Sequence, residues 1–274
     1  MNAEGKALVT GASRGLGRAI ARELALRGFD VVATMRNPDD GEGLRAEVEA
    51  EGRRLRIARL DVDDPDTIEI PDGLRVLVNN AGVEGEYYAI EDAPLDLWRR
   101  IFETNVFGLV ETTRRALPVL RASGGGVVCN VTSSSILFPM PLYAAYRASK
   151  AAVSAMGESL RAEVAGHGIR VLEILPGPIA TDMLSGSDRL PESASNPAYG
   201  ALSQWALEQR RGVAPMVTPA GDAARTIADA ILDDEAPLRV GCDPLAVGAI
   251  DAWRATADED LMGPMLAALP DPDR

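Results

Sequence analysis

The fold is decided by one stretch near the amino terminus, Thr10-Gly11-Ala12-Ser13-Arg14-Gly15-Leu16-Gly17. It directly follows an apolar run at residues 7–10 and directly precedes a helical pattern at residues 18–27. A glycine turn lets the backbone approach a pyrophosphate, and the helix that follows offers free N–H groups to that anion. The stretch predicts a dinucleotide site, with a ligand-free tight turn as the alternative. The residues expected at the cofactor are Gly11, Ser13, Arg14, Gly15, Leu16 and Gly17.

Short apolar runs alternate with amphipathic helical patterns along the rest of the chain. The runs lie at residues 31–34, 55–60, 76–78, 127–131, 170–175 and 238–241, and the longer helical patterns at residues 95–120 and 147–164. This rhythm predicts an α/β fold, a single doubly wound domain with a mostly parallel seven-stranded sheet and helices on both faces. Residues 61–75 are few for a helical crossover, so an abbreviated helix is expected there.

The domain prediction covers residues 1–274 as one unit, which is long enough to bury one sizeable core. Residues 176–219 change character, with Gly, Ser and Pro scattered among a few apolar residues. We interpret about 183–218 as a partly helical substrate lid, with a simple surface excursion as the alternative. Residues from about 258 to 274 are interpreted as a loosely held tail.

Composition excludes several classes of function. With 28 Lys+Arg against 41 Asp+Glu, the formal net charge is −13, which disfavours nucleic acid and anionic lipid as partners. No apolar run approaches the roughly 18 to 20 residues of a membrane span, and we expect a cytoplasmic protein. His167 is the one histidine, and Cys129 and Cys242 are the two cysteines. No multi-histidine metal cage or histidine triad is therefore expected, and the predicted metal content is none.

The second apolar run ends in Thr34-Met35-Arg36, which bears on the choice of cofactor. A carboxylate at this position favours the ribose 2′-OH of NAD, whereas arginine favours the 2′-phosphate of NADP. Arg36, with Arg14 as a second cation, predicts NADP(H) over NAD(H). Both arginines could instead be solvated surface charges, and Asp39 and Asp40 weaken the local field.

A second chemical signal is Tyr146-Arg147-Ala148-Ser149-Lys150, in which a four-residue offset places phenol and ammonium on one helix face. Lys150 and Lys6 are the only lysines of an arginine-rich chain. Using a tyrosine of pKa about 10 as a base near neutral pH requires roughly 4 kcal/mol of phenolate stabilisation. An ammonium about 4 Å away supplies roughly that amount at an effective dielectric of about 20. The pair predicts proton transfer without a metal.

The chain resembles the short-chain dehydrogenase/reductase family over residues 5 to 183. The resemblance rests on an ordered set of motifs: the Gly11-to-Gly17 turn, Asn79-Asn80-Ala81-Gly82, Asn105, Ser133, the Tyr146/Lys150 pair and Pro176-Gly177.

The resemblance implies a role for each matching residue. Tyr146 would be the acid/base on the substrate oxygen, and Ser133, thirteen residues earlier (146 − 133), would polarise that oxygen. Lys150 would bind the nicotinamide ribose and lower the pKa of Tyr146, and Asn105 would kink its helix and hold a water. The other residues implied at the cofactor are Asp61, Val62, Asn80, Ala81, Gly82, Pro176, Gly177, Ile179 and Thr181.

Three of these assignments have alternatives. Ser134 and Ser135 are neighbours that could replace Ser133. Asn105 could face solvent, and Asp61 could be a turn residue before Asp63-Asp64-Pro65. Tyr143 is set aside because Arg147, not a lysine, stands four residues after it.

The predicted reaction is reversible hydride transfer between NADP(H) and a ketone or aldehyde and its alcohol. A medium-sized hydrophobic substrate is expected from an apolar segment before Tyr146, although core packing explains the segment equally well. The segment comprises Leu137, Phe138, Met140, Leu142 and Tyr143. The rival classes are a nicotinamide-binding sensor without turnover and a sugar-nucleotide epimerase or dehydratase. By resemblance, the long helices imply a homodimer or homotetramer.

Overall fold

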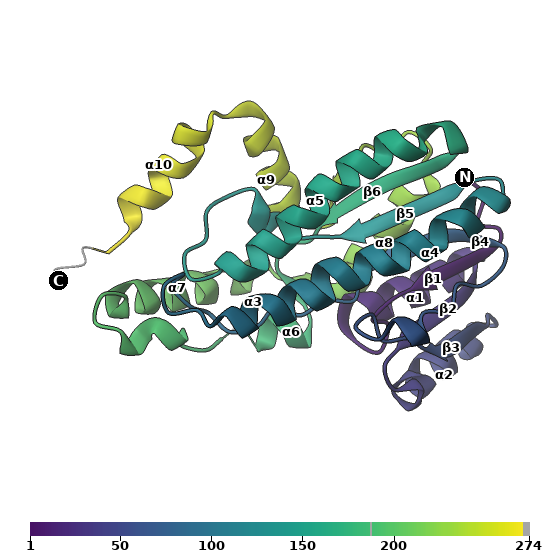
Figure 1. The fold of residues 1–274 in the computed structure, drawn as a ribbon, viewed down its shortest axis with the longest axis horizontal. Helices are drawn as coiled ribbons and strands as arrows, with labels where there is room; N and C mark the ends of the chain where they lie inside the picture. Colours follow the sequence, from purple (N-terminus) through teal and green to yellow (C-terminus); the bar gives the residue numbers. More distant parts are fainter. Residues whose placement is uncertain (187, 271–274) are drawn as a thin grey trace.

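The centre of the protein is a seven-stranded parallel sheet in the order β3-β2-β1-β4-β5-β6-β9 (Figure 1). The computed structural model describes residues 1–186 and 188–270. The strands are β1 (Lys6–Val9), β2 (Asp30–Met35), β3 (Leu55–Arg59), β4 (Leu74–Asn79), β5 (Gly126–Val131), β6 (Ile169–Leu175) and β9 (Arg239–Gly241). Each strand overlaps one of the seven apolar runs, so the predicted α/β fold is confirmed.

Helices cover both faces of this sheet (Figure 1). One face is covered by α1 (Gly15–Arg27), α2 (Glu42–Ala50) and α8 (Ala220–Leu232). The other is covered by α4 (Leu109–Ala122) and α5 (Ala144–Val164). The sequence analysis named neither α2 nor α8, nor α9 (Pro244–Ala255), which follows β9.

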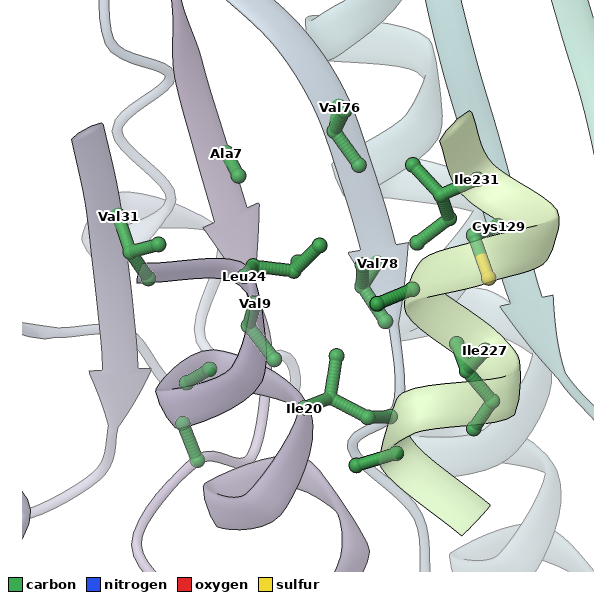
Figure 2. Close-up of a cluster of buried hydrophobic side chains, with 14 of the residues drawn as sticks. Ala7, Val9, Ile20, Leu24, Val31, Val76, Val78, Cys129, Ile227 and Ile231 are labelled. Atoms are coloured by element: carbon green, nitrogen blue, oxygen red, sulfur yellow. The ribbon is translucent and has the colours of Figure 1, made fainter. Parts of the chain in front are cut away.

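Alternation along the strands supplies the two layers of the core. From β4, Val76 and Val78 point to the α1/α8 side, where Ile20 and Ile227 meet them (Figure 2). Leu77, between them, packs with the residues of α4 and α5. Successive side chains of a strand point to opposite faces of the sheet. Because helices cover both faces, both sets of side chains are apolar, and each strand is a continuous apolar run in the sequence.

The crossover from β3 to β4 contains only a 3₁₀ turn, Pro65–Thr67, which confirms the abbreviated helix. Asp64 precedes it and accepts a hydrogen bond from the Asp66 N–H. Ile68 then packs against Leu60 and Val62, so a small apolar cluster occupies this side of the sheet.

The predicted helix at residues 95–120 is divided into three parts. A π-helical segment, Glu103–Gly108, separates α3 (Leu95–Phe102) from α4. π-Helical segments are rare in proteins, but those that occur are often found at functional sites. This one carries Asn105.

The segment interpreted as a lid contains α6 (Asp182–Ser185) and α7 (Gly200–Gly212), and α7 lies at the same end of the molecule as α3 (Figure 1). The strands β7 (Ile179–Ala180) and β8 (Thr218–Pro219), which the sequence analysis did not anticipate, pair in parallel at its two ends. Residue 187, within this segment, lies outside the described residues.

The predicted loose tail contains a helix, α10 (Asp258–Ala268), which has no buried residue and extends away from the sheet (Figure 1). Three acidic residues in its first turn, Asp258, Glu259 and Asp260, favour the helix through its dipole. Residues 271–274 of the predicted tail lie outside the described residues.

Ile227→Ala tests the packing of α8 on the sheet. The side chain is fully buried, so its loss is expected to lower the free energy of unfolding by about 2 to 4 kcal/mol. Val247→Ala, at a residue 47% exposed, is the control and should change it by less than about 0.5 kcal/mol. Urea denaturation measures both, and equal effects would contradict this description of the core.

Candidate active site

The turn between β1 and α1 requires its glycines. Gly11 has a φ of 66°, and a Cβ there would stand 2.8 Å from the Cα of Ala81. A Cβ on Gly17 would stand 2.2 Å from Nδ2 of Asn80. That amide donates to the carbonyls of Thr10 and Gly11, at 3.0 and 3.2 Å. The turn and the segment after β4 are therefore held in direct contact.

The amino terminus of α1 is available to an anion. Arg14, at the cap position, makes no side-chain capping bond, and the first turn holds no acidic residue. Its N–H groups and the positive end of its dipole therefore face no fixed negative charge of their own turn. This arrangement fits a dinucleotide pyrophosphate.

Tyr146 and Lys150 lie on one face of α5, as their spacing predicts, and are 8% and 5% exposed. The Lys150 Nζ donates to the carbonyl of Val131 at 3.0 Å, where β5 ends. It lies 5.7 Å from the centroid of the Tyr146 ring. The helix thus fixes both side chains at the carboxyl end of β5.

Ser133 is the serine that reaches Tyr146. It lies two residues beyond β5, and its hydroxyl is close enough to the phenol to lower the pKa of Tyr146. The two alternatives, Ser134 and Ser135, are buried in the 3₁₀ turn Ser134–Ile136. The Ser133 hydroxyl also accepts the Ser135 N–H at 3.2 Å, which fixes its position.

Burial governs the charge state of the pair. It raises the pKa of Tyr146, the negative charge of Glu84 raises it further, and the Ser133 hydroxyl lowers it. Burial also lowers the pKa of Lys150 to about 8. The Lys150 ammonium donates to the Val131 carbonyl, and the lowering of the Tyr146 pKa by Lys150 stays a prediction. At neutral pH the structure favours a protonated phenol.

Asn105 is fully buried, so the solvent-facing alternative is wrong. Its Oδ1 accepts the Val83 N–H at 2.8 Å, and its Nδ2 donates to the Val83 carbonyl at 2.9 Å and to Ser149 Oγ at 3.0 Å. The amide thereby ties the segment after β4 to α5, beside Lys150. Both its donors are used in this way.

The remaining predicted cofactor residues fall into two groups. Ser134 N–H donates to the carbonyl of Pro176, and Gly177 N–H donates to Asp243. Thr181 caps α6, and a Cβ on Gly15 would lie 3.3 Å from it. The segment after β6, including the buried Ile179, therefore adjoins both the serine turn and the glycine turn.

The second group lies at the ends of β2 and β3. Arg36 is exposed directly after β2. Asp61 accepts a hydrogen bond from the Asp63 N–H, as in the alternative in which it is a turn residue. Val62 packs in a cluster with Ala81. None of these three contacts Tyr146, but all follow strands whose carboxyl ends meet at one edge of the sheet.

A polar cluster that the sequence did not predict lies beside Tyr146. Tyr143, which the sequence pattern disfavoured, stacks on Tyr146 with ring centroids 4.8 Å apart. The hydroxyls of Tyr143 and Tyr87 both donate to Oε1 of Glu84. Arg210, from α7, lies over the Tyr87 ring. Two of its members lie near a sequence signal: Tyr143, three residues before Tyr146, and Glu84, two residues after the Asn79-to-Gly82 motif.

The backbone is strained where this cluster begins. Leu142, one residue before Tyr143, has a φ of 64°, which a branched side chain rarely adopts. Its side chain is buried against Tyr87 and Ala206, so packing holds this conformation. Tyr143 is thereby set in a fixed position on Tyr146.

Among the described residues, no cluster of three or more His, Cys, Asp or Glu side chains is arranged to hold a metal ion. Nor does any helix in the described ranges have the length and apolar character to cross a membrane.

Comparison with known proteins gives matches over most of the chain. A family model described as short chain dehydrogenase matches residues 5–190. The uncharacterized oxidoreductase YusZ of Bacillus subtilis is 40% identical over 191 residues, which cover 66% of this chain and 67% of that protein. The family match spans the glycine turn, Asn105, Ser133, Tyr146 and Lys150.

Two solved structures show the same fold. A short chain dehydrogenase from Burkholderia cenocepacia, in complex with NADP, has a TM-score of 0.75 at 27% identity and covers 99% of this chain and 100% of its own. A short chain dehydrogenase/reductase from Burkholderia phymatum, in complex with NAD, also has a TM-score of 0.75, at 23% identity, with 92% and 93% covered. The second is a likeness of fold alone.

Proposed function

Since this chain belongs to the short-chain dehydrogenase/reductase family of oxidoreductases, we propose that it interconverts a ketone or aldehyde and the corresponding alcohol with NADP(H). The proposal rests on one observation above all, the buried pair of Tyr146 and Lys150 at the carboxyl end of β5, where Lys150 donates to the Val131 carbonyl and Ser133 follows the strand. When bound, the cofactor supplies or accepts a hydride at its nicotinamide ring.

The residues that would hold the cofactor line the carboxyl edge of the sheet. The uncapped start of α1 would bind the pyrophosphate, and Asn80, Ala81 and Gly82 would form the wall next to it. Lys150 would bind the nicotinamide ribose, and Ile179 and Thr181 would contact the carboxamide. The close approach of Gly11 to Ala81 holds the glycine turn against this wall, because a side chain on Gly11 would collide with the Ala81 backbone.

The preference for NADP is supported by Arg36. It is exposed directly after β2 and, among the described residues, forms no ion pair. Arg14 lies 3.9 Å from Asp182, but both side chains are about three-quarters exposed, so this pair would compete weakly with a phosphate. Of the two solved structures described above, one holds NADP and the other NAD, so the preference rests on Arg36 and Arg14.

In the reductive direction, Ser133 would donate a hydrogen bond to the substrate carbonyl oxygen, and Tyr146 would give that oxygen its proton. The pKa of Tyr146 is raised above its ordinary value, so at neutral pH the phenol carries the proton that it would donate. Oxidation would need the phenolate as proton acceptor, so it should be favoured at alkaline pH.

The expected hydrophobic substrate loses part of its support. Leu137 packs with Leu175 and Ile250, and Leu142 with Tyr87, so both belong to the core. The polar cluster of Glu84, Tyr87, Tyr143 and Arg210 lies nearer the phenol. We therefore propose a medium-sized carbonyl substrate without a strictly apolar character.

Assembly into a homodimer or homotetramer is part of the same proposal. Leu95 on α3 and Phe107 in the π-helical segment are exposed large apolar residues. A second copy of this chain would cover them.

Tyr146→Phe is expected to lower kcat for ketone reduction by at least about 100-fold, because it removes the proton donor. NADPH affinity should stay within a few-fold, as measured by fluorescence titration. Tyr143→Phe, which also removes one hydroxyl, is the control and should retain far more activity. Turnover in Tyr146→Phe as fast as in wild type would refute the assignment. A wild-type protein that binds NADPH but reduces no carbonyl would favour the sensor.

Arg36→Asp should shift the ratio of kcat/KM for NADPH to that for NADH by about 10-fold or more toward NADH, because a phosphate contact is replaced by a repulsion. Arg53→Asp is the control, because it makes the same charge change at an exposed residue before the amino end of β3, at the other end of the strands from Arg36. It should leave the ratio unchanged. An unchanged ratio in Arg36→Asp would mean that another group reads the phosphate.

Glu84→Gln should move the alkaline limb of the pH profile for carbonyl reduction to lower pH. Glu84 raises the pKa of Tyr146, so removing its charge lowers that pKa and the phenol loses its proton sooner. Glu86→Gln, at a carboxylate paired with Arg100, is the control and should not move it. A limb that moves to higher pH, or stays in place in Glu84→Gln, would contradict the assignment of this limb to Tyr146.

A further inference from the structure

Two arginines of the segment after β7 converge on one aromatic ring beside the proposed catalytic phenol. The guanidinium carbon of Arg210 lies 3.5 Å from the centroid of the Tyr87 ring, and that of Arg189 lies 5.0 Å from it. Arg210 is also 5.9 Å from the centroid of the Tyr143 ring. Since Tyr143 stacks on Tyr146, a single ring separates Arg210 from the proposed proton donor.

The Arg210 guanidinium lacks the partners that a partly buried cation needs. Its Nη1 is buried and has no hydrogen-bond partner in the part of the chain that the structure describes. Over the same residues, Arg210 forms no ion pair within 4.0 Å, whereas its neighbour Arg211 pairs with Asp188 at 2.6 Å. The face of Tyr87 stabilises the cation, but it supplies no acceptor in the guanidinium plane for the buried Nη1.

The nearby carboxylates are engaged elsewhere. Oε1 of Glu84 accepts the hydroxyls of both Tyr87 and Tyr143. Oε2 of Glu192 accepts the backbone N–H of Tyr87 at 2.8 Å. The Glu84 charge acts on Arg210 only at longer range. Two cations therefore share the Tyr87 ring. Arg189 donates to the Gly85 carbonyl at 2.6 Å, so the buried Nη1 of Arg210 is the donor that an anion would satisfy.

We propose that Arg210, assisted by Arg189, binds a carboxylate carried by the carbonyl substrate, so that the enzyme acts on oxo acids and the corresponding hydroxy acids. The inference rests on the proposed function and deepens it by naming the substrate class. The planar guanidinium fork matches a carboxylate with two parallel hydrogen bonds. In a chain of net charge −13, an anionic substrate requires such a local cationic site.

The position of the two arginines suits a substrate that reaches from Tyr146 toward α7. The carbonyl would lie at Ser133 and Tyr146, and the carboxylate would lie past Tyr143, under α7. Both arginines come from the segment interpreted as the lid, and both already lie against Tyr87. A merely structural Arg210 would pack α7 on Tyr87 without distinguishing between substrates.

The test compares oxo acids with their methyl esters, which keep the carbonyl and lose the charge. A series from 2-oxobutanoate to 6-oxoheptanoate, each with its ester, is assayed by NADPH oxidation with wild type, Arg210→Met and Arg211→Met. Methionine keeps much of the apolar stem of arginine, so packing on Tyr87 is largely retained. Arg211→Met, on the same helix, is the matched control.

For at least one chain length, wild type is expected to use the acid about 10- to 100-fold better than the ester in kcat/KM. Arg210→Met should remove this advantage through a higher KM for the acid and leave the ester nearly unchanged. Arg211→Met should retain it. Equal use of acids and esters by wild type, or equal loss for both substrates in Arg210→Met, would overturn the proposal.

Binding provides a second readout that does not depend on turnover. Calorimetric titration of the NADP⁺ complex with the same oxo acids should show affinity that falls about 10-fold or more in Arg210→Met but not in Arg211→Met. If no carbonyl is reduced but this binding is found, the proposed function fails and the carboxylate site stands. If esters are reduced and oxo acids bind no more tightly than their esters, the carboxylate site fails and the proposed function stands.

Discussion

The arrangement of this protein depends on one buried contact, the hydrogen bond from the Lys150 ammonium to the carbonyl of Val131. Burying an ammonium is costly unless its protons find acceptors, and this carbonyl lies where β5 ends and its ladder with β6 runs out. The contact sets the position of α5 along the sheet. Tyr146, one turn earlier on the same face, is thereby brought to Ser133, which follows the same strand.

The electrostatics of the site follow from this burial. Desolvation and the Glu84 carboxylate favour the protonated phenol, and the Ser133 hydroxyl favours the phenolate. Lys150 is close enough to belong to the site, but its ammonium is directed to the backbone of β5. Burial and Glu84 thus oppose ionisation of the phenol, and the lowering of its pKa by Lys150 stays a prediction.

Sequence patterns were sufficient for the sheet and for the residues around its carboxyl edge, because these depend on local features. The glycine turn, the Tyr146/Lys150 offset and the apolar runs are each read within a few residues. The cluster of Glu84, Tyr87, Tyr143 and Arg210 could not be predicted, because it joins segments distant in the chain through ring stacking and a strained Leu142. The direction of the Lys150 bond and the pairing of β7 with β8 likewise depend on tertiary packing.

The central claim is that a carbonyl is reduced at the carboxyl edge of the sheet, beside Tyr146. The most direct measurement is a carbonyl reduction with NADPH that carries deuterium at the transferable position of its nicotinamide ring. The fate of this deuterium is then followed. The product alcohol, analysed by mass spectrometry and NMR, is predicted to carry one deuterium on its carbinol carbon. Deuterium found in the solvent, or an alcohol without label, would contradict hydride transfer and with it the account of the site.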